Sequence, residues 1–376
     1  MPICHANRVT ASGQKDTMRN YRNSPHQERV ETFYKNLQGR QTVSSVLKRQ
    51  KQFFLFDKKM SVWEASLYLG AVKDESDPDT DHVQSVHAYQ TALSMEENFL
   101  QGPFSSKLKD IAIRELFSDS QWQRLPAKVR DRYESFRSVD RLFSHIESWD
   151  WLPLVGFIHD LGKILAMADF WPDGKKIPQY EIVGDTFPLG AAFSSRNIFY
   201  QKGFYKHNPD FGHSVYSTKT GIYKEHCGLD NVLFTFGHDE YFAEVLHQAV
   251  LERAKKHPSL PRLPSEAIHM IRFHSAYVWH TPRMTSGRED TGYDFLADDK
   301  DYDQLVLLKM LQKSDLYSKG LKVPDMERHS LRYRGLVEKY IGKEEISWRY
   351  VPHGRFSGIM AQDVQKVEEE LCSLRG

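Results

Sequence analysis

Residues 151–163 read WLPLVGFIHDLGK, and this stretch decides the fold that the sequence predicts. An apolar run through Ile158 ends in His159 and Asp160, and Lys163 follows on the helix face of His159. A buried imidazole and carboxylate without partners would cost several kcal/mol, a cost that a metal ion would remove. An isolated His-Asp pair is common by chance, and His238-Asp239 is a second one. The apolar context nevertheless indicates a buried helix that ends at a metal site.

Helical periodicity surrounds this stretch on both sides. Apolar residues recur at helical spacing from Gln27 to about Gly70, and helix resumes at Ser85 after an acidic, proline-containing loop at 74–81. Further helical patterns occupy four later ranges: 230–254, 264–277, 303–318 and 331–340. Residues 180–212 predict loops with room for a short pair of strands. Because strands do not alternate with helices and no repeat is present, we predict a mainly α fold.

Composition excludes several classes of protein. The 376 residues carry 51 Lys and Arg against 50 Asp and Glu, so no net positive field would attract nucleic acid or an anionic membrane. Three cysteines, far apart in the sequence, argue against a disulfide framework and fit a reducing compartment. No apolar run approaches the roughly 18 to 20 residues that span a bilayer. We expect a soluble, cytoplasmic protein, favour a monomer, and expect a small or neutral partner.

Four further residues in apolar settings could join His159 and Asp160 at a metal: His87, His238, His274 and Asp315. Each histidine alone fits an ordinary core residue better than a ligand. Together, four imidazoles and two carboxylates suit iron, manganese or zinc. Because six protein donors would leave no open position on one ion, the count predicts two ions.

Asp160 is the natural bridge between two such ions. One ion would take three other donors: His87, His159 and Asp315. His238 and His274 would hold the second ion, which then has room for two substrate oxygens. The first ion has room for one small ligand such as dioxygen. The hypothesis therefore predicts two unequally filled metal positions.

Longer motifs make the sequence resemble a known family. They are Arg19-Asn-Tyr, VKDESDPDTD at 72–81, VHAYQTA, GFIHDLGK, IVGDTFPLG, YSTKTGIYKEHCGLDNVLFTFGHDEY at 216–241, MIRFHSAYVWHT and SDLYSK. In this order, from about residue 19 to 348, they resemble the myo-inositol oxygenases. The resemblance implies an HD-domain-like helical bundle around a di-metal centre with two iron ions per chain, a mixed-valent non-haem pair. It also implies cleavage of the myo-inositol ring by dioxygen to give D-glucuronate and water.

The resemblance implies residue roles as well. The implied metal ligands are His87, His159, Asp160, His238, His274 and Asp315, the set reached above. Lys163 and Asp160 are the implied catalytic residues. The implied substrate contacts are Arg19, Asp74, Ser76, Lys163, Gly184, Asp185, His274, Ser275 and Lys319. A neutral polyol offers only hydroxyl groups, and this mixture of donors and acceptors suits it.

The resemblance also divides the chain. It implies a catalytic domain at 27–348, followed by a C-terminal extension at 349–376. Residues 1–26 are polar and lack helical periodicity, so we expect a flexible arm or lid there. Charged residues 96–148, with helical periodicity but no cluster of site-like residues, are interpreted as a helical insertion. Residues 284–301 are interpreted as a loop insertion. Both avoid the matching motifs.

The nearest alternative is an HD-type metal-dependent phosphohydrolase, which would use similar ligands to activate water against a phosphate ester. Such a site needs cationic groups that converge on the phosphate oxygens. Asp74, Asp77 and Asp185 would instead repel a phosphate dianion. Oxidative cleavage of an organophosphonate meets the same objection, and a decayed site would not require all six ligands.

Overall fold

The structure is a computed structural model, and it describes the chain in six ranges: 24, 26–171, 174, 176–281, 292–318 and 323–351. Two predicted substrate contacts, Arg19 and Lys319, lie outside the described residues. So do nearly all of the predicted arm and most of the C-terminal extension.

Helices form almost all regular structure in the described ranges, so the predicted mainly α fold is confirmed. The longer helices are α1 (Gln27–Arg40), α2 (Val43–Leu55), α4 (Gln84–Phe99), α9 (His238–Lys256), α10 (Ser265–Phe273), α12 (Asp299–Ser318) and α13 (Met326–Tyr340). The shorter ones are α3 (Val62–Tyr68), α5 (Asp119–Arg124), α6 (Ala127–Phe136), α7 (Val139–Leu142), α8 (Leu152–Ile158) and α11 (Tyr277–His280). Short 3-10 helices connect them, including η2 (Ile113–Leu116), η3 (Leu161–Ala166) and η8 (Leu229–Asn231).

Extended structure is scarce and differs from the expectation. A two-stranded antiparallel sheet joins β1 (Lys59–Met60) to β2 (Ile346–Ser347), far from the range where strands were expected. Within 180–212 the structure has 3-10 turns, and Pro188 forms an isolated bridge with Phe234. The predicted strand pair within 180–212 is therefore wrong.

The predicted helix at 230–254 begins late, at His238. Residues just before it are extended, and Thr235 N donates to the Phe187 carbonyl at 2.9 Å. Gly237, in an extended conformation, precedes the first turn. Pairing with the 187–189 segment thus overrides the helical pattern, and it fixes His238 as the first helical residue.

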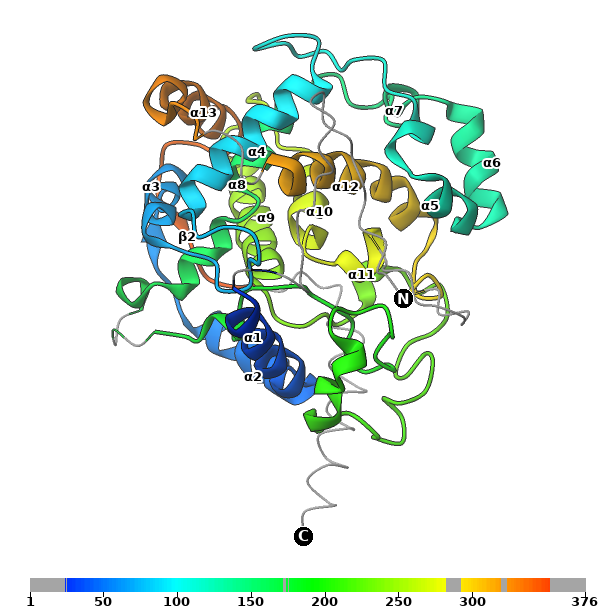
Figure 1. The fold of residues 1–376 in the computed structure, drawn as a ribbon. Helices are drawn as coiled ribbons and strands as arrows, with labels where there is room; N and C mark the ends of the chain where they lie inside the picture. The colour runs from blue at the N-terminus through cyan, green and yellow to red at the C-terminus, as the bar shows by residue number, and fades with distance from the viewer. Residues whose placement is uncertain are drawn as a thin grey trace.

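Five helices surround the core of the molecule. Figure 1 shows α4, α8, α9, α10 and α12 together in the middle of the view, with α1 and α2 below them and α5–α7 at one side. Every residue of α8 is buried, which explains its apolar sequence. Pro153 lies in its first turn, where a missing amide hydrogen costs nothing. α8 therefore carries His159 and Asp160 into the centre of the protein.

The segment between α4 and α8 packs against α12. The guanidinium of Arg132 makes two hydrogen bonds to the Asp303 carboxylate, at 2.8 and 2.6 Å. Lys128 pairs with Asp299 at 2.7 Å, and Lys313 donates to the Glu115 carbonyl at 3.0 Å. The predicted helical insertion is thus fastened along the helix that bears Asp315.

Residues near the end of the described chain complete the core. Trp348 is fully buried, and its indole N–H donates to the Met60 carbonyl at 2.9 Å. The Tyr241 hydroxyl, on α9, donates to the Trp348 carbonyl. Tyr350 is also fully buried, with its hydroxyl 3.0 Å from Glu240. The first residues after 348 therefore pack on α9.

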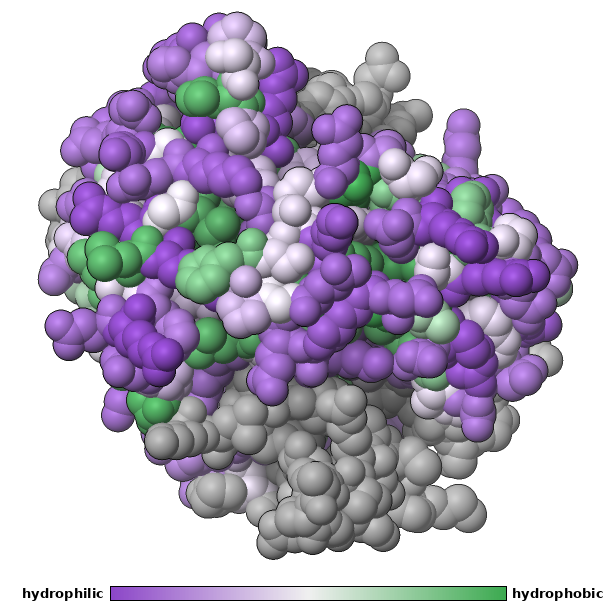
Figure 2. Space-filling view, turned by 90° about the horizontal axis from the view of Figure 1, so that it is seen from above, coloured by the Kyte–Doolittle hydropathy of each residue, from purple (hydrophilic) through white to green (hydrophobic). Residues whose placement is uncertain are grey.

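The face of the molecule in Figure 2 is mostly hydrophilic, with hydrophobic residues in separate patches. Leu331 and Phe104, 80% and 74% exposed, stand out among the described hydrophobic side chains. The guanidinium carbon of Arg332 lies 4.1 Å from the centre of the Phe104 ring and so covers part of it. None of the described helices is long and apolar enough to cross a membrane.

Candidate metal centre

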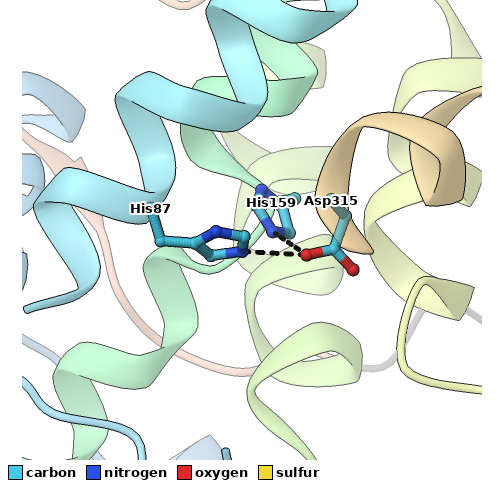
Figure 3. Close-up of side chains that lie close together, drawn as sticks. All are labelled: His87, His159 and Asp315. Carbon is cyan, nitrogen blue, oxygen red and sulfur yellow. Dashed lines mark ion pairs between the residues drawn. The ribbon is translucent and has the colours of Figure 1, made fainter. Parts of the chain in front are cut away.

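Six buried donors meet at the centre of the fold. They lie on α4 (His87), at and just after the end of α8 (His159, Asp160), at the first residue of α9 (His238), just after α10 (His274) and on α12 (Asp315). Each is at most 5% exposed. Figure 3 shows the side chains of His87, His159 and Asp315, which converge from α4, the end of α8 and α12. The structure thus brings together every ligand that the sequence predicts.

The first group contains His87, His159 and Asp315, whose donor atoms all lie within 4.8 Å of one another. Asp315 Oδ1 is 2.8 Å from His87 Nε2 and 3.7 Å from His159 Nε2 (Figure 3). Asp160 Oδ2 approaches the same two nitrogens, at 3.6 and 3.5 Å. One carboxylate oxygen of Asp160 therefore faces this group.

The other oxygen of Asp160 faces a second group. Asp160 Oδ1 lies 3.0 Å from His238 Nε2 and 3.3 Å from His274 Nε2. The two Nε2 atoms are 3.1 Å apart. Histidine nitrogens bind first-row metals at about 2.1 Å, so two ligands at a right angle on one ion would be about 3 Å apart. The observed separations fit that spacing.

Backbone carbonyls fix which ring nitrogen carries the hydrogen in three of the four histidines. Nδ1 donates to a carbonyl in three of them: His159 to Gly156 at 2.8 Å, His238 to Ile182 at 3.1 Å and His274 to Ile271 at 2.7 Å. A carbonyl only accepts, so Nδ1 must carry the hydrogen. In the neutral ring Nε2 then keeps its lone pair, the arrangement found in metal-binding histidines.

Several buried nitrogens in the described residues lack a hydrogen-bond partner, and His159 Nε2 is one of them. His159 Nε2 makes no hydrogen bond to any described residue, although its side chain is fully buried. An unsatisfied buried polar group costs about 1–3 kcal/mol. A metal ion would remove this cost, since the same nitrogen faces both Asp160 and Asp315. The donor set therefore fits a metal pair, with Asp160 able to touch both ions.

The pKa values of Asp160, His238 and His274 are shifted in different directions. Burial would raise the pKa of Asp160, but Lys163 and the neighbouring histidines lower it well below its usual range. Burial lowers the pKa of His238. Burial also opposes protonation of His274, yet its contact with Asp160 raises its pKa overall. A proton taken by His274 would compete with a metal ion.

Gly162 allows the turn after Asp160 to approach α9 closely. A Cβ atom at this position would lie only 2.0 Å from the carbonyl oxygen of His238. Glycine is therefore required for His238 to reach Asp160, which gives the glycine of the HDLGK motif a structural role beside that of His159 and Asp160.

Lys163 lies beside the candidate metal ligands rather than among them. Its ammonium donates to Asp74 Oδ2 at 2.7 Å, to Asp160 Oδ2 at 2.8 Å and to Gln84 Oε1 at 2.9 Å. Lys163 is 4% exposed and Gln84 is 3% exposed. The sequence analysis missed Gln84, although it stands three residues before His87 and hence on the same helix face.

The remaining predicted substrate contacts lie in two segments. Ser76 donates from its amide and hydroxyl to Asp74 Oδ1, at 2.8 and 2.6 Å. Asp185 accepts from the buried Tyr34 hydroxyl at 2.7 Å, a contact with no signal in the sequence. Gly184 has a φ of +96°, in the region that favours glycine.

Ser275 follows His274 directly and is 5% exposed. Its carbonyl accepts from Thr186 N at 2.9 Å, which links this residue to the 184–186 segment. The segment of Asp185 and the segment of His274 are thus held side by side.

A cavity of about 330 Å³ opens beside the 72–81 loop. Its lining includes Arg29, Lys73, Asp74 and Lys176, together with apolar atoms of Ala166 and Met167. The volume is at the lower end of the range for ligand pockets, about 300–1,000 Å³. Because Asp74 also binds Lys163, this cavity borders the same polar network.

Comparison with known proteins identifies the family. The sequence model of the family described as myo-inositol oxygenase matches residues 27–113 and 127–348. The chain belongs to the myo-inositol oxygenase family. It is 36% identical over 335 residues to inositol oxygenase of Dictyostelium discoideum, covering 89% of this chain and 90% of the relative. Inositol oxygenase of Mus musculus is 36% identical over 327 residues, covering 87% and 89% of the two chains.

A plant relative, inositol oxygenase 2 of Arabidopsis thaliana, is 35% identical over 327 residues, covering 86% of this chain and 81% of the relative. The family assignment made from the motifs is therefore confirmed. Within the predicted helical insertion, the family match leaves out residues 114–126 and passes through the rest. The predicted loop insertion lies inside the match. The domain boundaries and the roles of individual residues stay predictions.

Proposed function

We propose that this protein is an inositol oxygenase that cleaves myo-inositol with dioxygen to give D-glucuronate and water. One ring C–C bond breaks, the substrate loses four electrons, and dioxygen accepts them. One oxygen atom enters the carboxylate and the other leaves as water. The near balance of charge and the scarcity of cysteine support an enzyme of the cytoplasm that acts on a neutral substrate, and we propose that it works as a monomer.

The arrangement of the six buried donors carries this proposal. His87, His159 and Asp315 would hold one ion, His238 and His274 the other, and Asp160 would contribute one oxygen to each. Two iron ions per chain would supply the redox chemistry of dioxygen, which no protein side chain here can perform. Support comes from donor separations of 2.8 to 3.7 Å and from the lone pairs that the backbone leaves on Nε2.

The chain's own residues would bind and orient the polyol. Lys163 would donate to a reacting hydroxyl, and its positive charge would favour loss of that hydroxyl's proton. Asp74, Asp185 and Ser275 would meet other hydroxyls, since a polyol both donates and accepts at every oxygen. Burial of these side chains excludes water and strengthens each polar contact. Arg19 and Lys319 are proposed contacts that lie outside the described residues.

A turnover assay tests the proposal. The protein is loaded with ferrous iron, incubated with myo-inositol in air, and assayed for D-glucuronate by mass spectrometry. We expect product only with iron, dioxygen and myo-inositol together. Controls without iron or under nitrogen should give none. The proposal is wrong if the fully loaded protein forms no uronate from any inositol isomer.

The phosphohydrolase alternative predicts the opposite dependence on dioxygen. It requires phosphate release from a phosphate ester under nitrogen. In the structure, Lys163 is already paired with two carboxylates, which leaves little positive charge for a phosphate dianion. The same protein sample, tested with inositol phosphates under nitrogen, should release no phosphate.

A further inference from the structure

Lys163 has no spare hydrogen-bond donor in this structure. An ammonium group has three N–H bonds, and Lys163 has three acceptors within 2.9 Å: Asp74, Asp160 and Gln84. If Lys163 binds a substrate hydroxyl, as proposed above, one of these three contacts must be released. The acceptor that Lys163 releases then becomes available for a hydrogen bond with the substrate.

Gln84 is the acceptor that costs least to release. Asp74 and Asp160 are carboxylates, so each adds the attraction between opposite charges to its hydrogen bond with the ammonium, and burial strengthens that attraction. Gln84 offers an uncharged amide oxygen, and its contact, at 2.9 Å, is the longest of the three. An incoming hydroxyl would therefore displace Gln84 and leave both carboxylates on Lys163.

Release of Gln84 leaves a buried amide that needs a new partner. The residue is 3% exposed, and its backbone is fixed because Gln84 N donates to the Val72 carbonyl at 2.9 Å. A buried amide oxygen without a donor costs about 1–3 kcal/mol. A hydroxyl group can supply that donor while it accepts from Lys163, and a neighbouring hydroxyl can do so as well. A polyol can therefore satisfy both side chains at once.

We infer that Gln84 is a specificity-determining residue. In the ligand-free protein it accepts a hydrogen bond from Lys163. When a substrate hydroxyl replaces it on Lys163, Gln84 binds a hydroxyl of the polyol instead. The inference rests on the proposed function and adds a residue to the substrate site. The site would select a polyol hydroxyl at one ring position, through an exchange of partners between Lys163 and Gln84.

Binding measurements with deoxy analogues test the exchange. Iron-loaded protein is titrated under nitrogen, where no turnover occurs, with myo-inositol and with each of its single-deoxy analogues in an isothermal titration calorimeter. In the wild-type protein we expect one analogue to bind about fivefold or more weakly because it lacks the hydroxyl that meets Gln84. In Gln84→Leu this discrimination should disappear, while discrimination against the other analogues persists.

A second variant separates contact with the substrate from support of Lys163. Gln84→Glu keeps an acceptor for Lys163 but makes it charged, so the ammonium would not be released, and it removes the amide N–H donors. We expect weaker binding of myo-inositol together with reduced discrimination. If Gln84→Glu binds every ligand as the wild type does, or Gln84→Leu keeps its full discrimination, the inference is wrong.

Gln50→Leu is the matched control. Gln50 is a buried glutamine on α2, 5% exposed, whose amide oxygen makes no hydrogen bond to a described residue. Its variant should discriminate like the wild type, and iron content should be equal in all four proteins. Failure of the proposed function would look different, because the wild-type protein itself would then neither bind myo-inositol nor form glucuronate.

Discussion

Substitution of Gly162 by alanine should damage the second metal position more than the fold. The new Cβ would lie 2.0 Å from the His238 carbonyl oxygen, and real Cβ contacts essentially never fall below 3.0 Å. The atoms that the Cβ would meet belong to the backbone of His238 and cannot rotate away as a side chain could. The turn after Asp160 and the start of α9 must therefore separate by about 1 Å. Metal–ligand distances tolerate only about 0.2 Å. His238 would then lie too far away to share the proposed ion with Asp160 and His274.

We expect a loss of at least about tenfold in affinity for one of two ions, and a fold destabilised by about 1–3 kcal/mol. The assay is iron per chain by inductively coupled plasma mass spectrometry, after anaerobic loading and desalting, with thermal unfolding of the same samples. The ion count should fall from two toward one in Gly162→Ala.

Gly335→Ala is the control for this measurement. Gly335 lies on α13, and a Cβ added there would have no described atom within 4 Å, so alanine should leave the ion count at two. It should also stabilise the helix by about 0.5–1 kcal/mol. Two tightly bound ions and an unchanged melting temperature in Gly162→Ala would refute the packing argument.

Three further predictions concern single side chains. His238→Ala should lower the iron count from two toward one, whereas His145→Ala, at an exposed ring, should not change it. Lys163→Met should lower the rate of glucuronate formation about 100-fold or more, while Lys309→Met, at an equally buried lysine, should retain it. Burial, followed by the charge of Lys309, lowers the pKa of His280 to about 3, so the folded protein resists a proton that the unfolded chain accepts near pH 6.5. The free energy of unfolding of the metal-free protein should therefore fall by up to about 1.4 kcal/mol per pH unit below pH 6.5. Urea unfolding at a series of pH values measures this, and in His280→Gln the free energy of unfolding should depend less steeply on pH.

Much of the helical fold could be predicted from periodicity, because helix faces repeat locally in the sequence. Helical periodicity gave the wrong structure where a segment pairs with residues far away in the sequence. Residues before His238 pair with the 187–189 segment, and β1 and β2 are two residues long and meet from opposite ends of the domain. Neither contact leaves a local signal, since its stabilisation comes from tertiary packing.

The candidate ligands could be named from apolar context and motifs, but their geometry could not. Which oxygen of Asp160 faces which histidines depends on how α8, α9 and α10 pack. The same is true of Tyr34 on Asp185, where α1 meets a loop that follows much later in the chain. Gln84 left a faint signal through its spacing from His87, which becomes informative only once Lys163 is known to lie opposite.

The order in which the ligands are made constrains how the centre can be assembled. His87 lies on α4, whereas Asp315 lies on α12, and Trp348 must still reach Met60 and Tyr241 before α9 is fully packed. During synthesis, the first proposed ligand therefore leaves the ribosome long before its partner exists. A complete pair of metal positions needs nearly the whole described chain, so iron would be inserted into a finished apoprotein. Loading of the centre would then depend on the metal that is available after translation.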